Sequence, residues 1–282
     1  MPILLRRVGD IITSRSNPTV VKIGKLEDKK HRDAEGLFRF DGQKLFVEAL
    51  SFGVAPEYVF IKESREKELV ETLTDKLSNI PDKTVEYILV GDSAFEKMTN
   101  EKAPDGIIFC GKHLDKLHKS IKISNGNFEL ADGRLFMLES VRDPGNLGAV
   151  LRCAAAFGVS QIVMSEDCAD IYNPKTVRAS MGALFKVSTV KTDNLPDTIR
   201  AIKDSGRRVF ATALDFGAIK LGQFEILETD VFLVGNEGHG LSVETIEASS
   251  GSVFIPMMEG TESLNAATAA AVCMWEAARK SL

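Results

Sequence analysis

Three polar, glycine-rich segments in the C-terminal half of the chain carry residue types that could bind and orient a ligand. Residues 139–148 contain Asn146, residues 235–240 read Gly-Asn-Glu-Gly-His-Gly, and residues 255–265 end in Ser-Leu-Asn. Each segment follows a short apolar run, and in a parallel sheet such runs end at one edge, where ligands bind. Amides, hydroxyls and a carboxylate gathered there could orient a polar substrate, while glycines would leave backbone N–H and C=O groups open to a nucleotide-like ligand.

Each segment also has a purely structural explanation. Residues 144–146 could form an ordinary turn with Asn146 as a helix N-cap, Ser263 could cap the last helix, and residues 235–240 could be only a tight connection. One such segment would be weak evidence, but three at one edge of the same sheet favour a binding site.

A dinucleotide site is disfavoured by the order of the glycines. They do not follow the pattern Gly-x-Gly-x-x-Gly, and the chain contains no Gly-Lys-Ser/Thr phosphate loop. Glu166 does end a predicted strand after the first segment, where a ribose-binding acid would lie. Because the glycine order is wrong, we do not expect nicotinamide cofactors to bind.

The elements that must position these segments are those of an α/β protein. In the C-terminal half, short apolar runs alternate with helical patterns, and they predict strands at residues 135–138, 161–164, 208–213, 231–234 and 253–255. A helix is predicted over residues 147–157, and another at the C-terminus. The expected fold is an open parallel sheet covered by helices on both faces.

The N-terminal part predicts a separate small α/β domain. Its predicted strands are residues 36–41, 58–62, 85–90 and 106–110, and its predicted helices are residues 19–30, 43–52 and 63–77. Residues 111–133 then become rich in Lys, His, Ser, Asn, Asp and Gly, which is typical of a linker. We therefore predict one domain over residues 1–110, a linker over 111–131 and a second domain over 132–282.

The composition is that of an ordinary globular protein, with 44% hydrophobic and 27% charged residues and a net charge of −5. We expect no membrane span and no secretion signal, because no run approaches the required length and the first residues lack the signal pattern. The four cysteines are scattered without a Cys-x-x-Cys pair, so neither a metal site nor a disulfide framework is expected. Together these features indicate a cytoplasmic protein.

The charge is locally basic near the N-terminus, although the whole chain is acidic. A cluster of this kind can neutralise RNA phosphates, but it is also what a solvated helix face looks like. The residues that we take as candidate RNA contacts are Arg15, Lys22, Lys29, Lys30 and Arg32.

The three segments together resemble the SpoU (TrmH-like) branch of the SPOUT RNA methyltransferases. The matching motifs are residues 142–152 (Arg-Asp-Pro-Gly-Asn-Leu-Gly-Ala-Val-Leu-Arg), 173–182, 232–242 and 255–265, in the family's order across residues 132–282. The N-terminal part resembles the family's L30e/L7Ae-like substrate-binding domain over residues 12–44. It departs at Asp41, where the family usually has Glu.

The resemblance implies S-adenosylmethionine-dependent methylation of a ribose 2′-hydroxyl in RNA, and a homodimer. The N-terminal domain favours 23S-type ribosomal RNA as the substrate, with a guanosine as the candidate nucleotide. The resemblance also implies a C-terminal SPOUT domain with a deep trefoil knot, a rare exception to ordinary topology. The implied catalytic residues are Arg152, Asn146, Glu237, Ser263 and Asn265. The residues implied to hold the cofactor through their backbone are Gly235, Ile255 and Leu264.

The role of Arg152 and the identity of the RNA stay open. Arg152 lies off the apolar stripe of its predicted helix, so by pattern alone it is a solvated residue. An arginine is a poor base because its guanidinium keeps its proton, and it could instead clamp a phosphate and stabilise an oxyanion. The alternatives are a transfer RNA substrate and a catalytically silent RNA-binding protein; the intact catalytic set disfavours the latter.

Overall fold

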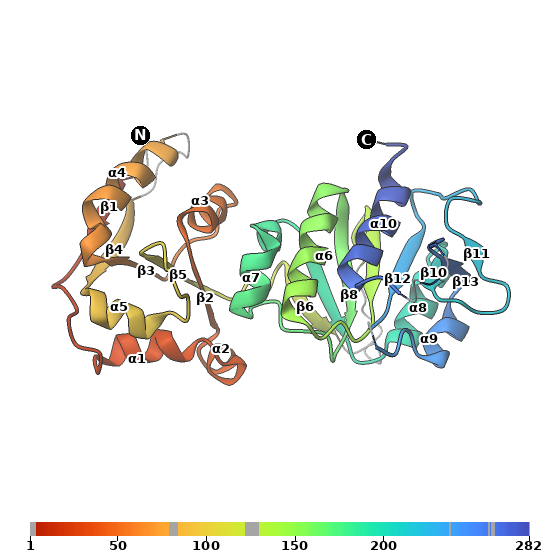
Figure 1. Cartoon of the computed structure of the whole chain (residues 1–282), viewed down its shortest axis with the longest axis horizontal. Helices are drawn as coiled ribbons and strands as arrows, with labels where there is room; N and C mark the ends of the chain where they lie inside the picture. The colour runs from red at the N-terminus through yellow and green to blue at the C-terminus, as the bar shows by residue number, and fades with distance from the viewer. Residues whose placement is uncertain are drawn as a thin grey trace. The chain divides into compact units, whose positions relative to one another are not determined.

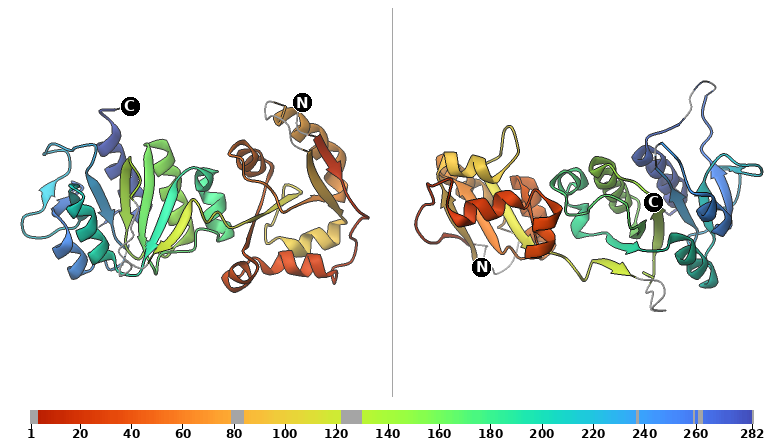
Figure 2. Two further views of the ribbon diagram at one scale, coloured as in Figure 1. Left: turned by 180° about the vertical axis from the view of Figure 1, so that it is seen from behind. Right: turned by 90° about the horizontal axis from the view of Figure 1, so that it is seen from below.

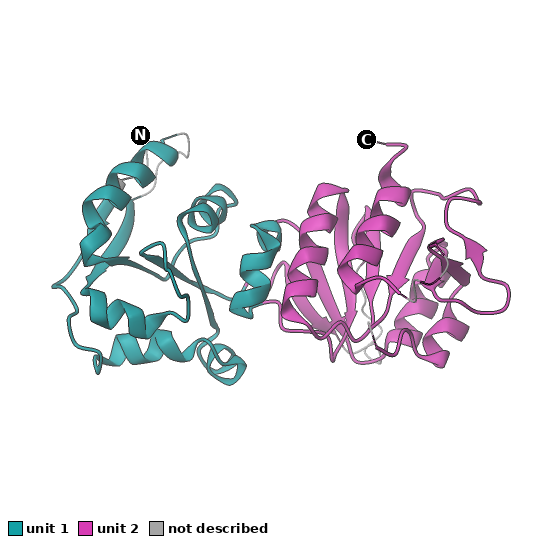
Figure 3. Ribbon diagram, viewed as in Figure 1, with its two compact units in different colours: residues 1–113, 172–185 teal, residues 114–171, 186–282 magenta. Residues whose placement is uncertain are grey.

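The computed structural model describes residues 4–78, 84–121, 130–236, 238–258, 260 and 263–281, and Figures 1 and 2 show it from three sides. The chain divides into two compact units, coloured separately in Figure 3. One consists of Met1–His113 with Tyr172–Phe185, and the other of Leu114–Ile171 with Lys186–Leu282. The unit boundaries therefore differ from a simple division near residue 111, because a short segment from the C-terminal half belongs to the first unit.

The first unit is built on a mixed five-stranded sheet of order β1-β4-β3-β5-β2, in which β5 runs antiparallel to both β3 and β2. Its strands are β1 (Leu4–Arg7), β2 (Leu37–Asp41), β3 (Tyr58–Lys62), β4 (Thr84–Val90) and β5 (Ile107–Lys112). Its helices are α1 (Pro18–Lys25), α2 (Lys29–Glu35), α3 (Gln43–Ser51), α4 (Glu66–Lys76), α5 (Asp92–Met98) and α7 (Pro174–Ser180). The strand at the N-terminus, β1, had no predicted counterpart.

The helix predicted over residues 19–30 is broken into α1 and α2. Asn17 caps α1, its side chain accepting from Thr19 N, and Pro18 occupies the first turn. Asp28 then adopts an extended conformation. Arg32, which is only 1% exposed, donates from Nη1 to the backbone oxygens of Leu26 and Glu27. The break is stable because this guanidinium satisfies carbonyls that would otherwise be left without partners at the helix end.

The α7 segment completes the aromatic core of the first unit. Phe38 on β2 lies 5.1 Å from Tyr172, and Phe40 lies 5.9 Å from Phe185, measured between ring centroids. Phe40 also stacks on Phe109 of β5, with the ring centroids 4.6 Å apart. Burial of these rings on β2 accounts for the grouping of residues 172–185 with a domain far away in sequence.

The second unit contains an eight-stranded sheet of order β11-β13-β10-β12-β7-β8-β9-β6, in which every ladder is parallel. The predicted α/β fold with a parallel sheet and a separate N-terminal domain is thus confirmed. The strands are β6 (His118–Ile121), β7 (Arg134–Leu138), β8 (Val159–Ser165), β9 (Ser188–Thr192), β10 (Val209–Thr212), β11 (Ile219–Lys220), β12 (Val231–Val234) and β13 (Gly251–Phe254).

Part of the segment predicted as a linker is a strand. Residues 118–121 form β6, which pairs in parallel with β9 at the edge of the sheet. His118 and Thr189, opposite each other in this ladder, are hydrogen bonded at 3.0 Å between Nδ1 and Oγ1. β6 could not be predicted because its residues are mostly polar. An edge strand of this kind is defined by its pairing with a neighbouring strand rather than by its own hydrophobicity.

Helices cover both faces of the parallel sheet, as Figures 1 and 2 show. On one face α6 (Pro144–Ala156) packs beside α10 (Ala266–Ala278). On the other face α8 (Leu195–Asp204) packs beside α9 (Val243–Ala248) over a core that includes Met137, Ile199 and Leu233. None of the described helices is long and apolar enough to cross a membrane.

Candidate active site

A pocket of about 390 Å³ opens at the carboxyl edge of the parallel sheet, beside the ends of β10, β12 and β13. Its size lies within the roughly 300–1,000 Å³ that is usual for small-molecule sites. The residues predicted to hold the cofactor, Gly235, Ile255 and Leu264, all line it, together with Ser263. The adjacency of these strands in the sheet is what brings the second and third polar segments together.

Gly235 permits the close turn of backbone that forms one wall of the pocket. A Cβ atom at this position would lie 2.4 Å from the backbone oxygen of Gly240, so a side chain cannot be placed there without moving the chain. Residues 236 and 240 are joined by a pair of backbone hydrogen bonds of 3.1 and 2.9 Å. A close approach of two backbone segments therefore requires a glycine at this position.

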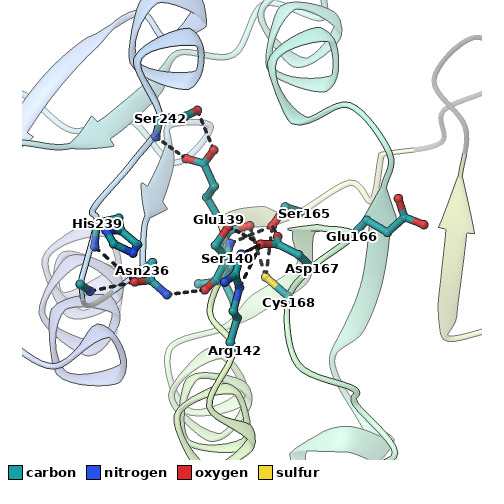
Figure 4. A network of polar contacts seen from close by, with 12 residues as sticks. Glu139, Ser140, Arg142, Ser165, Glu166, Asp167, Cys168, Asn236, His239 and Ser242 are labelled. Atoms are coloured by element: carbon teal, nitrogen blue, oxygen red, sulfur yellow. Dashed lines mark hydrogen bonds and ion pairs between the residues drawn. The ribbon is translucent and has the colours of Figure 1, made fainter.

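Asn236 organises the same loop through its side chain. Its Oδ1 accepts hydrogen bonds from the backbone N–H groups of Gly238 and His239, at 2.8 and 3.3 Å. Its Nδ2 donates to the backbone oxygen of Ser140, at 2.8 Å. One amide thus folds the loop after β12 and ties it to the end of β7, as Figure 4 shows.

Ser140 lies at the centre of a polar network that also includes the end of β8 (Figure 4). It adopts a left-handed conformation with φ of 55°, which is unusual for a residue other than glycine. Its N–H donates to Ser165 Oγ at 2.8 Å, and its hydroxyl donates to Asp167 Oδ2 at 2.6 Å. These hydrogen bonds compensate for the backbone strain, which is commonly found at functional sites.

Asp167 is the charged centre of this network. Its Oδ2 pairs with Arg142 at 2.7 Å, and its Oδ1 accepts from Ser165 at 2.6 Å. Burial opposes the negative charge, but the hydrogen bonds from Ser140, Ser165 and Arg142 outweigh it and lower the pKa of Asp167 to about 2. The carboxylate is therefore ionised at neutral pH and holds the start of the first polar segment.

The helix after that segment begins earlier than predicted, and its cap is a different residue. α6 starts at Pro144, and Asp143 is its N-cap, accepting from Asn146 N at 2.9 Å. Asn146 is consequently inside the first turn, with its side chain available to another element. Likewise, the last helix is capped by Asn265 rather than by Ser263. The structural explanations offered for Asn146 and Ser263 were therefore wrong.

The structure brings together some of the predicted catalytic residues. Asn265 Nδ2 donates to Asn146 Oδ1 at 3.0 Å, and Ser263 lies at the pocket. Arg152 is exposed on α6, and among the described residues none forms a hydrogen bond or ion pair with its side chain. Glu237 lies outside the described residues. The predicted roles of all five residues stay predictions.

Several residues of the site were not found from the sequence. Thr212, Ala213 and Leu214 line the pocket from the end of β10. The predicted strand over residues 208–213 was the available signal, because its carboxyl end must share the edge used by its parallel neighbours. Glu139 and Asn236 fall within the segments identified from the sequence, but no role was predicted for either residue. The described residues contain no group of three or more His, Cys, Asp or Glu that could hold a metal.

The basic residues predicted to contact RNA divide into two kinds. Arg15, Lys29 and Lys30 are exposed, and Lys22 is partly exposed beside Glu35, with 2.7 Å between Nζ and Oε2. Arg32 is buried against the end of α1 and offers no charge to a ligand, so we correct its assignment to a structural one. Its place in the local basic cluster could not reveal that its side chain points inward.

Known proteins match both units of the chain. A model of the SpoU rRNA Methylase family matches residues 133–275, and a model of the MRM3-like substrate binding domain matches residues 17–108. The 23S rRNA (guanosine(2553)-2′-O)-methyltransferase RlmP of Bacillus subtilis is 30% identical over 94% of this chain and 97% of its own length. The 23S rRNA (guanosine-2′-O-)-methyltransferase RlmB of Coxiella burnetii is 27% identical over 79% of this chain and 87% of its own.

Solved structures agree over nearly the whole chain. A crystal structure of an RNA 2′-O ribose methyltransferase superposes with a TM-score of 0.79 at 25% identity, covering 96% of this chain and 99% of that one. The crystal structure of the AdoMet-bound rRNA methyltransferase from Sinorhizobium meliloti superposes with a TM-score of 0.78 at 27% identity, covering 99% of both chains. The predicted family resemblance is confirmed.

Proposed function

Because the chain belongs to the SpoU rRNA methylase family and is an RNA ribose 2′-O-methyltransferase that uses S-adenosylmethionine, we propose that it methylates a guanosine of 23S-type ribosomal RNA. The observation that carries the choice of RNA is the extent of the match. RlmP aligns over 94% of this chain, including the front domain that would select the substrate. We also propose a cytoplasmic location, because the two 23S rRNA methyltransferases reported above come from bacteria.

The pocket beside Gly235, Ile255 and Leu264 is the proposed cofactor site. Its lining suits a nucleoside because the apolar side chains of Leu241, Ile255 and Leu264 line it together with Gly235 and Gly240, which carry no side chain to obstruct a ligand. S-adenosylmethionine supplies an electrophilic methyl group on a sulfonium when bound. The backbone of the loop after β12 would hold the adenine and methionine parts, and the surrounding apolar wall would exclude water.

The proposed catalytic residues act on the ribose rather than on the cofactor. Arg152 would clamp the phosphate beside the target ribose and stabilise the 2′-oxygen as its proton passes to water, since a guanidinium keeps its own proton and cannot accept another. Asn146 and Asn265, joined to each other, would orient the 2′-hydroxyl, with Ser263 beside them at the pocket. Glu237 completes the proposed set. Alignment of donor and acceptor can supply several kcal/mol, roughly 7–11 in favourable cases.

A homodimer is the proposed assembly, with α10 at the interface. This helix is apolar around most of its circumference, reading Ala-Ala-Thr-Ala-Ala-Ala-Val-Cys-Met-Trp-Glu-Ala-Ala. One side packs on α6, but Trp275 is 50% exposed and contacts Phe157 only edge-on, with 5.9 Å between ring centroids. A helix that is apolar on its outer side is expected to be covered by a partner.

We further propose that the C-terminal segment is threaded through a loop to form the trefoil knot of the family. In support of this proposal, the chain leaves β13 near the edge of the sheet and then returns to its middle. There α10 packs on α6 and against strand β12.

The RNA interface proposed for the first unit lies around α1 and α2. Lys22, Lys25 and His31 line a surface depression there, and Arg15, Lys29 and Lys30 are exposed in the same region of the sequence. These charges would bind RNA phosphates without reading bases.

Mapping 2′-O-methyl groups on total RNA from cells with and without the gene tests the proposed function. A single guanosine position in 23S-type RNA should lose its methyl group in the deleted strain, and the purified protein with S-adenosylmethionine should restore it. Loss of a transfer RNA methyl group instead would overturn the ribosomal assignment. No change in any RNA would favour the silent RNA-binding alternative.

A further inference from the structure

The carboxylate of Glu139 collects three hydrogen bonds from a single short stretch of chain. Its Oε1 accepts from the hydroxyls of Ser242 and Thr245, at 2.7 and 3.0 Å, and its Oε2 accepts from the backbone N–H of Ser242, at 3.0 Å. Glu139 directly follows β7, whereas Ser242 and Thr245 begin α9. Figure 4 shows the Glu139 side chain extended from the strand end to Ser242.

These hydrogen bonds hold one end of the loop that forms the pocket wall. We call residues 235, 236 and 238–242 the cofactor loop; Gly235, Asn236, His239, Gly240 and Leu241 all line the pocket. At its other end, Asn236 donates to the backbone oxygen of Ser140. The cofactor loop is thus attached at both ends to two consecutive residues, 139 and 140, at the end of β7.

The Glu139 carboxylate accepts from the hydroxyls of both Ser242 and Thr245, and it fixes the direction in which they point. Ser242 already caps α9 through its hydrogen bond with Thr245 N at 3.3 Å, and Thr245 is fully buried. A charged acceptor adds hydrogen bonds that are about twice as strong as neutral ones, and it directs both hydroxyls toward β7. The geometry therefore sets where the loop's last residues, Gly240 and Leu241, lie at the pocket.

We propose that Glu139 is a positioning residue for cofactor binding, acting through Ser242 and Thr245 to hold the cofactor loop against the end of β7. This inference rests on the proposed cofactor site. The carboxylate does not touch the cofactor itself. It reduces the ordering that the loop would otherwise undergo when S-adenosylmethionine binds, which is how preorganisation increases affinity.

The test measures S-adenosylmethionine binding and turnover in Glu139→Gln and Thr245→Val. Gln keeps the size of Glu but replaces one acceptor with an NH₂ donor, which must face either the Ser242 N–H or the hydroxyls of Ser242 and Thr245. Val keeps the shape of buried Thr245 while removing one donated hydrogen bond. Glu247→Gln, an exposed residue on α9, is the matched control.

We expect the dissociation constant and the KM for S-adenosylmethionine to rise about tenfold in Glu139→Gln and less in Thr245→Val. The kcat at saturating cofactor and the KM for RNA should stay near those of the parent protein. The double variant should be no weaker than Glu139→Gln alone, because both changes remove one attachment. Glu247→Gln should bind normally.

Two results would overturn the proposal in distinguishable ways. An unchanged cofactor affinity in Glu139→Gln, with only a lower melting temperature, would show that the attachment serves folding alone. Gly235→Ala tests the pocket itself. If this variant folds and binds the cofactor with unchanged affinity, the pocket is not the cofactor site, and the proposed role of Glu139 is then wrong as well.

Discussion

The side chain of Asn265 donates a hydrogen bond to that of Asn146 across 3.0 Å, joining the first turns of α10 and α6. The same Asn265 side chain caps α10, its Oδ1 accepting from Ala267 N at 2.9 Å and from Thr268 N at 3.4 Å. The Asn265 amide therefore caps the start of α10 and also joins Asn265 to Asn146, the other asparagine proposed to act on the ribose.

The two tasks of Asn265 can be separated by Asn265→Asp. A carboxylate still caps the helix, and its charge is favourable at a helix N-terminus, so the melting temperature should stay close to that of the parent protein. It cannot donate to Asn146, however, so we expect kcat to fall about tenfold. Asn265→Ala should lose both the helix cap and the hydrogen bond to Asn146, and the lost cap should lower the free energy of unfolding by about 1 kcal/mol. Equal activity in Asn265→Asp and the parent protein would contradict the positioning role.

Arg152→Ala tests the proposed clamp. If Arg152 is only a solvated residue, Arg152→Ala should change the free energy of unfolding by no more than about ±0.5 kcal/mol and should leave methyl transfer unchanged. If it acts at the ribose, single-turnover methyl transfer should fall about a hundredfold or more with cofactor binding unchanged. Arg152→Lys keeps the charge without the planar fork, so it should fail almost as badly. Arg200→Ala, an exposed arginine on α8, is the control.

Lys29 and Lys30 should contribute RNA affinity, whereas Arg32 should contribute stability. Lys29→Ala/Lys30→Ala is expected to lower the salt dependence of RNA binding by about one unit of slope for each phosphate that the variant no longer neutralises. Lys67→Ala/Lys76→Ala on α4 removes equal charge and serves as the control. Equal slopes for the two double variants would rule out the proposed interface.

Arg32→Ala should instead destabilise the first unit by about 3 kcal/mol, because two carbonyls at the end of α1 are deprived of their charged donor. Denaturant unfolding measures this change. A folded Arg32→Ala protein with unaltered stability would contradict the structural role.

Asp167 should stabilise the protein at neutral pH and lose that contribution in acid. Its folded-state pKa of about 2 lies below the ordinary value near 3.9, so the stabilisation is present above about pH 4 and disappears as the pH falls toward 2. Because its side chain is 41% exposed, we expect only about 1 kcal/mol. The difference in unfolding free energy between the parent and Asp167→Asn should therefore be constant from pH 7 to about 4.5 and narrow below that.

Trp275 tests the proposed dimer. Light scattering of the parent protein at micromolar concentration should give twice the chain mass. Trp275→Arg places a charge on the outer side of α10 and should give a monomer that keeps its secondary structure. A monomeric parent protein that methylates RNA would contradict this assembly.

The fold class and four of the residues that line the pocket could be predicted from local sequence patterns. Strands such as residues 58–62 and 231–234 were predicted with the bounds observed, because a run of apolar residues between turn signals is a local property. Gly235, Ile255, Ser263 and Leu264 were placed at one site because parallel strands must end at the same edge.

Other features arise only from contacts between residues that are distant in the chain. Residues 118–121 are a strand only because β9 pairs with them, and residues 172–185 belong to the first unit because β2 offers aromatic rings to cover. Arg32 is buried because two carbonyls require its charge. Glu139 acquires a task only where Ser242 and Thr245 meet it. No local pattern encodes such pairings, since each is selected by burial and hydrogen bonding in the folded chain.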